Sequence, residues 1–184
     1  MIRYTLVENE NDLEGILILQ KANLKKNLTP KEIKLDGYVT VDHDWETLKN
    51  LNETEPHVIA KDGNKIVGYV LTMTEKSRHD IPLIYPMFNE FDKLIYKGQS
   101  ISEYKYMVVG QACIHKDYRG KGLVEKCFQL YKETYSQFYD FSITEIDRIN
   151  KRSLNAHLKI GYKVIHSYKD NGKDWDVVLW DWNK

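Results

Sequence analysis

Residues 114–124 read Ile-His-Lys-Asp-Tyr-Arg-Gly-Lys-Gly-Leu-Val. They form a glycine-containing turn between a segment with the hydrophobic pattern of a strand and one with that of a helix. A long apolar strand is predicted over residues 104–114, and an amphipathic helix over residues 120–138. Glycines at the start of a helix leave backbone N–H groups unpaired, and the helix dipole adds positive charge there. The turn therefore favours an anionic ligand such as a phosphate, although a plain turn with solvated Arg119 and Lys121 explains it equally well. Its spacing is neither that of a P-loop nor that of a dinucleotide-binding glycine turn.

Residues 145–162 form a second informative segment, which runs from one predicted strand through a short helix to another strand. Asn150 is expected to cap the helix at its N-terminus, and Gly161 to end it in a left-handed turn. Glu145 is a carboxylate in an otherwise apolar strand, where a salt bridge is its ordinary explanation. Each of these residues has a structural explanation of its own. The segment therefore indicates a function only when it is considered together with residues 114–124.

The rest of the chain alternates between predicted strands and helices. Residues 75–103 are too long and too aromatic for a simple loop, and we expect them to be functional or partly helical. The order of elements predicts a mixed α/β domain whose strand–helix–strand–helix–strand centre has right-handed crossovers. Further strands are predicted at residues 2–7, 57–61, 65–73, 141–147, 162–168 and 175–182, and helices at about 13–27, from Pro30, near 45–51 and at 151–160.

Composition and charge exclude several classes of function. The 184 residues fit one domain, with 42% hydrophobic and 29% charged residues. Lys plus Arg and Asp plus Glu both number 27, so the chain has no net positive charge that would favour binding to nucleic acid or an anionic membrane. The two cysteines and six histidines have no disulfide or metal-ligand spacing, and we recognise neither a secretion signal nor a membrane span. We therefore expect a cytoplasmic protein with no bound metal and no nucleic-acid or membrane partner.

Together, the two segments resemble the acyl-CoA motifs of the GNAT superfamily of N-acetyltransferases. The first resembles the pattern [Q/R]-x-x-G-x-[G/A], with Val124 in place of the usual Gly or Ala. The second resembles a later motif in which many members have a Tyr where this chain has His157. The matching positions are Arg119, Gly122 and Val124 in the first segment, and Asn150, Ser153, His157, Gly161 and Tyr162 in the second.

This resemblance implies a fold and a domain organisation. The implied fold class is α/β (α+β), a mixed but mostly antiparallel central sheet of about six or seven strands flanked by about four helices. We expect residues 1–184 to form a single domain of this kind, with an acyl-CoA core at residues 104–168. The resemblance covers the core well, the flanking strands loosely, and residues 29–56 and 75–103 hardly at all.

The resemblance also implies acetyl-CoA as cosubstrate and direct acetyl transfer to an amine without a covalent enzyme intermediate. Backbone N–H groups of residues 119–124 would hold the pyrophosphate, and the end of the preceding strand would bind the pantetheine. Cys113 lies in that apolar strand, where burial raises a thiol pKa, so we do not expect it to be a nucleophile. The expected cofactor-binding residues are Ala112, Cys113, Ile114, Arg119, Gly120, Lys121, Gly122, Leu123, Val124, Asn150, Ser153 and His157.

Two residues are candidates for catalysis. An alkylamine with a pKa of about 10.4 is almost fully protonated at neutral pH, so a base must remove a proton before attack. Glu145 is the candidate base, with the salt bridge as its alternative. His157 would protonate the leaving thiolate or would orient the pantetheine.

The sequence identifies neither the acceptor amine nor the oligomeric state. The first helices and the aromatic residues 81–96 would line the acceptor pocket, although core packing or a dimer contact explains these aromatics equally well. The last strand, with Trp175, Trp180 and Trp182, is either inserted in the sheet or shared across a homodimer interface. Two other functions compete with acetyl transfer: a non-catalytic acyl-CoA-binding or regulatory domain, and a module that binds nucleotide phosphates.

Overall fold

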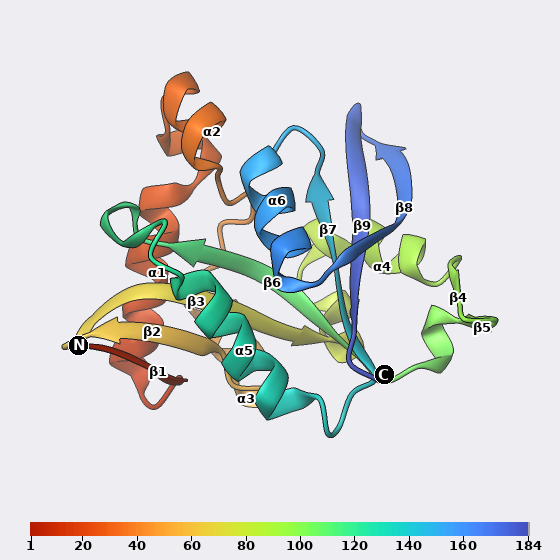
Figure 1. The fold of residues 1–184 in the computed structure, drawn as a ribbon, viewed down its shortest axis with the longest axis horizontal. Coiled ribbons are helices and arrows are strands. Elements are labelled where there is room, and N and C mark those ends of the chain that lie inside the picture. Colours follow the sequence, from red (N-terminus) through yellow and green to blue (C-terminus); the bar gives the residue numbers. More distant parts are fainter. Residues whose placement is uncertain (184) are drawn as a thin grey trace.

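A seven-stranded sheet runs through the centre of the protein (Figure 1). The computed structural model describes residues 1–183. All neighbouring strands are antiparallel except one parallel pair, β6 and β7, in the middle of the sheet. In order across the sheet the strands are β1 (Ile2–Leu6), β2 (Val58–Asp62), β3 (Lys65–Thr74), β6 (Tyr106–Ile114), β7 (Phe141–Asp147), β9 (Lys173–Asp181) and β8 (Lys163–Asp170).

Residues 1–183 also contain six α-helices, which cover both faces of the sheet (Figure 1). The predicted fold class is confirmed, with six helices where the resemblance implies about four. Two of the six have only seven residues each: α2, which begins at Pro30 as predicted, and α4, which lies in the segment expected to be partly helical. Local sequence sets their starts: the Asn9 side chain accepts from the N–H of Asp12, and Thr29 and Glu32 form a capping box at the start of α2. The helices are α1 (Glu10–Asn23), α2 (Pro30–Asp36), α3 (Trp45–Thr54), α4 (Tyr85–Phe91), α5 (Leu123–Tyr135) and α6 (Lys151–Ile160).

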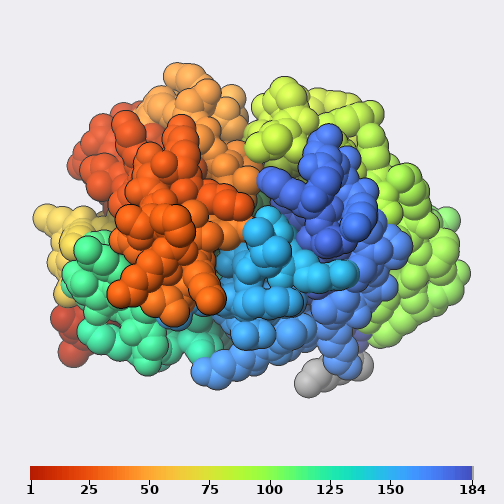
Figure 2. All heavy atoms as spheres, turned by 90° about the horizontal axis from the view of Figure 1, so that it is seen from above, coloured from red at the N-terminus to blue at the C-terminus, as the bar shows by residue number. Residues whose placement is uncertain are grey.

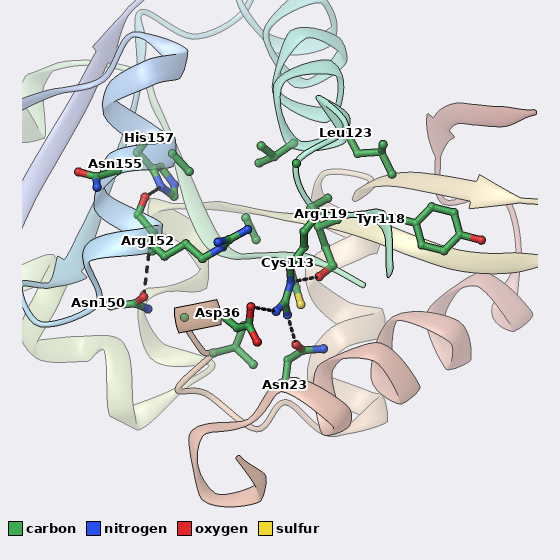
Figure 3. A pocket seen from close by; sticks show the side chains of 18 of the residues that line it. Asn23, Asp36, Cys113, Tyr118, Arg119, Leu123, Asn150, Arg152, Asn155 and His157 are labelled. Carbon is green, nitrogen blue, oxygen red and sulfur yellow. Dashed lines mark hydrogen bonds and ion pairs between the residues drawn. The ribbon is translucent and has the colours of Figure 1, made fainter. Parts of the chain in front are cut away.

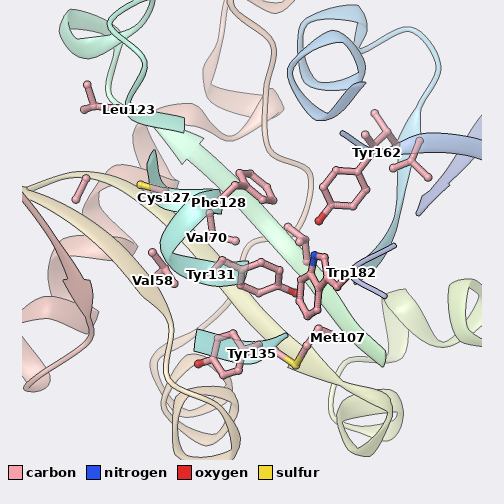
Figure 4. Packing of buried hydrophobic residues seen from close by; sticks show 14 of the residues in the cluster. Val58, Val70, Met107, Leu123, Cys127, Phe128, Tyr131, Tyr135, Tyr162 and Trp182 are labelled. Atoms are coloured by element: carbon pink, nitrogen blue, oxygen red, sulfur yellow. The ribbon is translucent and has the colours of Figure 1, made fainter. Parts of the chain in front are cut away.

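Helix α5 packs on one face of the sheet and buries a stripe of large side chains (Figure 4). The helix ends at Tyr135, three residues before the predicted end, and Phe138 is 64% exposed. Aromatic rings meet edge to face in this core, as between Phe128 and Tyr162 at 5.9 Å. The buried residues of α5 are Leu123, Cys127, Phe128, Tyr131 and Tyr135.

The sheet opens between β6 and β7. These strands pair only over residues 106–108 and 141–143, and they separate towards their C-terminal ends. The pairing of β3 with β6 shifts by one residue there, because Leu71 faces Gln111 and Thr72 faces Val109, so Gly110 is the extra residue of a bulge. A Cβ at Gly110 would lie 2.3 Å from the Met73 sulfur. The bulge bends β6, and the edge of β6 beyond Val109 that faces β7 is left without a strand partner in the described chain.

Residues 75–103 are partly helical, as the sequence predicts. They form the 3-10 turns Glu75–His79, Pro82–Ile84 and Ile101–Glu103, helix α4, and a hairpin of β4 (Ile95–Tyr96) and β5 (Gln99–Ser100). Helix α4 buries Met87, Phe88 and Phe91 against the face of the sheet opposite α5. Most of the aromatic rings of this segment therefore belong to the core.

The C-terminal strand β9 is inserted between β7 and β8. This position explains its alternation: Val178 and Trp182 pack in the core under α5, whereas Val177 and Leu179 pack in the core of the opposite face. Of the two explanations that the sequence leaves open for this strand, insertion in the sheet is the one observed.

Residues 1–183 contain neither a membrane-spanning helix nor a cluster of metal-ligating side chains. None of their helices combines the length and the apolar character that crossing a membrane requires. No three His, Cys, Asp or Glu side chains among them form a group that could hold a metal ion.

Candidate active site

The glycine turn before α5 presents backbone donors at the helix N-terminus. Gly120 and Gly122 have φ values of 73° and 78°, which are left-handed conformations that favour glycine. No side chain caps α5, and its first intrahelical bond runs from the N–H of Lys126 to the carbonyl of Gly122 at 3.3 Å. The N–H groups of Leu123 and Val124 have no acceptor within the helix, so together with the helix dipole they are suited to bind an anion.

Arg119 anchors this turn (Figure 3). Its Nε donates to the carbonyl of Ile114 at 3.0 Å, one terminal nitrogen donates to Asn23 Oδ1 at 2.6 Å, and the other lies 3.1 Å from Asp36 Oδ1. The backbone N–H of Arg119 donates to the carbonyl of Lys116 at 3.3 Å. Both its side chain and its N–H are thus used inside the protein, and the backbone donors for an anion begin after Arg119.

A cavity of about 370 Å³ extends from this turn along the end of β6 to α6 (Figure 3). All the predicted cofactor-binding residues line it except Lys121, whose Nζ instead donates to the carbonyl of Asp117 at 2.8 Å. The structure therefore brings eleven of the twelve predicted residues together at one cavity, and it shows the N–H of Arg119, predicted to bind the pyrophosphate, already bonded within the turn.

His157 lies at the inner end of this cavity, 5% exposed. Its ring meets the rings of Phe128 and Tyr162 at 5.2 and 5.1 Å. Its Nδ1 lies 2.9 Å from the carbonyl of Ser153, which can only accept, so Nδ1 carries the hydrogen and Nε2 has an unpartnered lone pair. Burial lowers the pKa of His157 to about 4, so the ring is neutral at neutral pH.

A second cavity, of about 360 Å³, lies on the other side of this point. It extends to the end of β7, the β8–β9 turn and the start of α4. Six residues line both cavities, so the two meet where β6 and β7 separate. The shared residues are Tyr38, Val39, Ala112, Asn150, Ser153 and His157.

Glu145 projects from β7 into the second cavity. Burial raises its pKa to about 7, and the hydrogen bond that it accepts from the Tyr168 hydroxyl opposes this rise. No ion pair involves Glu145 in the part of the chain that the structure describes, so the salt-bridge explanation does not apply. Tyr168, on β8, was not singled out by the sequence, because only the pairing of β8 and β9 beside β7 brings it to Glu145.

The end of α2 and the residues that follow it, 36–39, cross the junction of the two cavities. Asp36 holds Arg119 on one side, and on the other the Asn150 side chain donates to the carbonyl of Tyr38 at 3.0 Å. The Tyr38 hydroxyl donates to Asp147 at 2.8 Å. Figure 2 shows the orange part of the chain, which contains this segment, between the green turn before α5 and the light-blue part of the chain that contains α6. The sequence comparison with known motifs had not placed this segment in the site.

The sequence model of the Acetyltransferase (GNAT) family matches residues 22–162. This protein belongs to that family. The match includes the glycine turn, β6, β7 and α6, and it confirms the resemblance seen in the two motifs. Membership of the GNAT acetyltransferase family makes the protein an acyltransferase. No curated protein matches the sequence significantly.

Solved GNAT structures have the same fold. One is the NatC complex bound to Gag peptide and CoA, with TM-score 0.65, 16% identity, and 98% of each chain covered. Another is the Escherichia coli ribosomal-protein-S18-alanine N-acetyltransferase, with TM-score 0.64, 10% identity, and 100% and 96% covered. A third is yncA from Salmonella typhimurium with its cofactor acetyl-CoA, with TM-score 0.65, 14% identity, and 100% and 95% covered. At these identities the likeness concerns the fold.

Proposed function

We propose that this GNAT protein transfers the acetyl group of acetyl-CoA to a primary amine, which attacks the thioester directly. The observation that carries the proposal is the meeting of two cavities where β6 and β7 separate. One cavity begins at the unpaired helix N-terminus of α5, and the other contains a carboxylate whose pKa is raised to about 7. A phosphate-bearing acyl donor and an amine would thus reach one point from opposite sides.

The first cavity fits acetyl-CoA. The N–H groups after Gly120, including those of Leu123 and Val124, would bind the pyrophosphate. The free edge of β6, with Ala112, Cys113 and Ile114, would bind the pantetheine by strand-like hydrogen bonds. The GNAT structures solved with CoA or acetyl-CoA support this choice of donor.

The second cavity fits the amine and its deprotonation. Glu145, with a pKa of about 7, would accept a proton from the bound ammonium group at neutral pH. The amine nitrogen then forms a bond to the thioester carbonyl carbon, and the carbon–sulfur bond breaks to release CoA as a thiolate. The second proton of the attacking nitrogen passes to this thiolate, so that the products are the acetylated amine and the free thiol of CoA. A thiolate with a pKa of about 8.5 is a good leaving group and needs little help from an acid.

His157 and Cys113 fit supporting roles in this reaction. The His157 ring is neutral, and its one N–H is bonded to the carbonyl of Ser153, so we assign it to positioning the pantetheine and not to protonating the thiolate. Burial raises the pKa of the Cys113 thiol to about 12, which supports direct attack by the amine over an acetyl-cysteine intermediate. The expectations of a cytoplasmic location and a homodimer stay predictions.

Binding and turnover together test the proposal. By calorimetry, we expect acetyl-CoA to bind at least tenfold more tightly than ATP, because the free edge of β6 would bind the pantetheine, a group that ATP lacks. With acetyl-CoA and a panel of primary amines, we expect amine-dependent release of free thiol. Tight binding of acetyl-CoA without amine-dependent release would instead support the non-catalytic acyl-CoA-binding domain, and tighter binding of ATP would support the nucleotide module.

A further inference from the structure

A buried carboxylate without a cationic partner lies beside Glu145. Asp147 is 6% exposed, and it accepts hydrogen bonds from the Tyr38 hydroxyl at 2.8 Å and from the N–H of Ile149 at 3.2 Å. Two other carboxylates of residues 1–183 are buried to this degree, and each has a cation: Asp12 pairs with Lys61, and Asp176 with Arg148. No ion pair within the described chain involves Asp147. A buried carboxylate with only neutral partners is costly, and a cation supplied by a ligand would offset that cost.

Asp147 and Glu145 face the same cavity. They are two residues apart on β7, so their side chains lie on one face of the strand, and both line the second cavity. At a rise of about 3.3 Å per residue, their Cα atoms are separated by about 6.6 Å. An extended chain of four or five methylene groups places two nitrogens about this far apart.

The rest of the second cavity fits such a chain better than it fits an amino acid. Ile84, Met87 and Trp175 offer apolar surface for methylene groups. The only cation among its described lining residues is Lys173, which lies 5.5 Å from the Trp175 ring and pairs in register with Asp170. A substrate carboxylate would therefore meet more negative than positive groups.

We infer that the acceptor is an aliphatic diamine without a carboxylate, and that Asp147 is the residue that selects it. The amine to be acetylated lies against Glu145, and the second ammonium group lies against Asp147. This inference rests on the proposed function, because it names the acceptor of the same site.

Three amines of equal chain length test the inference: 1,5-diaminopentane, 1-aminopentane and lysine. The second lacks the distal ammonium group, and the third adds a carboxylate to the diamine. We expect kcat/KM for 1,5-diaminopentane to exceed that for 1-aminopentane at least tenfold and that for lysine by more. Calorimetry without acetyl-CoA is expected to give the same order of affinities. Equal or better use of 1-aminopentane or lysine would overturn the inference.

Substitution of Asp147 identifies the selecting group. Asp147→Asn retains an oxygen that accepts from Tyr38 but removes the charge, and we expect the ratio of kcat/KM for 1,5-diaminopentane over 1-aminopentane to fall at least tenfold. The control Glu53→Gln removes one charge from the exposed face of α3, outside both cavities, and is expected to keep the wild-type ratio. An unchanged ratio in Asp147→Asn would contradict the assignment.

The calorimetric comparison separates this inference from the proposed function. If the diamine binds at least tenfold more tightly than 1-aminopentane but is not acetylated, the acceptor class holds and the proposed acetyl transfer fails. If 1-aminopentane is acetylated as well as the diamine, the proposed function holds and the diamine inference fails.

Discussion

Replacing Glu145 with Gln is expected to lower kcat for acetyl transfer at least about a hundredfold, the usual contribution of a general base. Gln has nearly the same shape and can still accept from the Tyr168 hydroxyl, but it cannot take a proton from the ammonium group. Because Glu145 does not line the first cavity, we expect the Kd for acetyl-CoA to stay within about twofold of the wild-type value. Steady-state kinetics with saturating amine and calorimetry with acetyl-CoA measure the two quantities.

The pH dependence of kcat follows from the raised pKa of Glu145, about 7. A base acts in its deprotonated form, so kcat should fall about tenfold per pH unit below that pKa and level off above it. Tyr168→Phe removes the hydrogen bond that lowers this pKa, so its inflection should move to higher pH. In Glu145→Gln the inflection should be absent. A wild-type kcat and pH profile in Glu145→Gln would show that another group is the base.

A pair of substitutions at Val124 is expected to separate backbone from side-chain contributions to acetyl-CoA binding. Val124 is the second residue of α5, and its N–H has no acceptor within the helix. Proline is tolerated in a first helical turn, and Pro86 stands at the same position of α4. Val124→Pro removes one donor to the pyrophosphate, a charged hydrogen bond of about 1.5–3 kcal/mol, so the Kd should rise about tenfold to a hundredfold.

Val124→Ala is the matched control for this donor. It keeps the N–H and reduces the side chain to the size usual in the motif, so we expect the Kd for acetyl-CoA to stay within about threefold. Circular dichroism and thermal unfolding would verify that α5 forms in both variants. If the proline variant binds acetyl-CoA as tightly as the alanine variant, the pyrophosphate does not bind to this helix N-terminus.

Local patterns in the sequence were sufficient for the parts of the site that one segment forms alone. The glycine turn, the cap at Asn150 and the strand before the turn each depend on neighbouring residues, and the structure brings them together at one cavity. The raised pKa of Glu145 could not be predicted from local patterns, because the burial that causes it comes from strands and helices distant in sequence.

Contacts between segments that are distant in the sequence could not be predicted from local patterns. Tyr38 and Asp147 are 109 positions apart and meet only because residues 36–39 cross the opening of the sheet. Tyr168 reaches Glu145 only because of the strand order β7, β9, β8. The last strand of the chain, β9, is inserted between β7 and β8. The role of Arg119 as an anchor likewise depends on Asn23 and Asp36. Neither periodicity nor motif spacing specifies such pairings.

Direct transfer is most clearly tested by a single turnover. Excess protein would be mixed with acetyl-CoA and the best amine acceptor, quenched at successive times, and analysed by mass spectrometry of the amine, CoA and the intact protein. We expect acetylated amine and free CoA to appear at the same rate while the protein stays unmodified throughout. An acetyl group on the protein that forms and decays before the amine is acetylated, or bound acetyl-CoA that never acetylates an amine, would contradict the account.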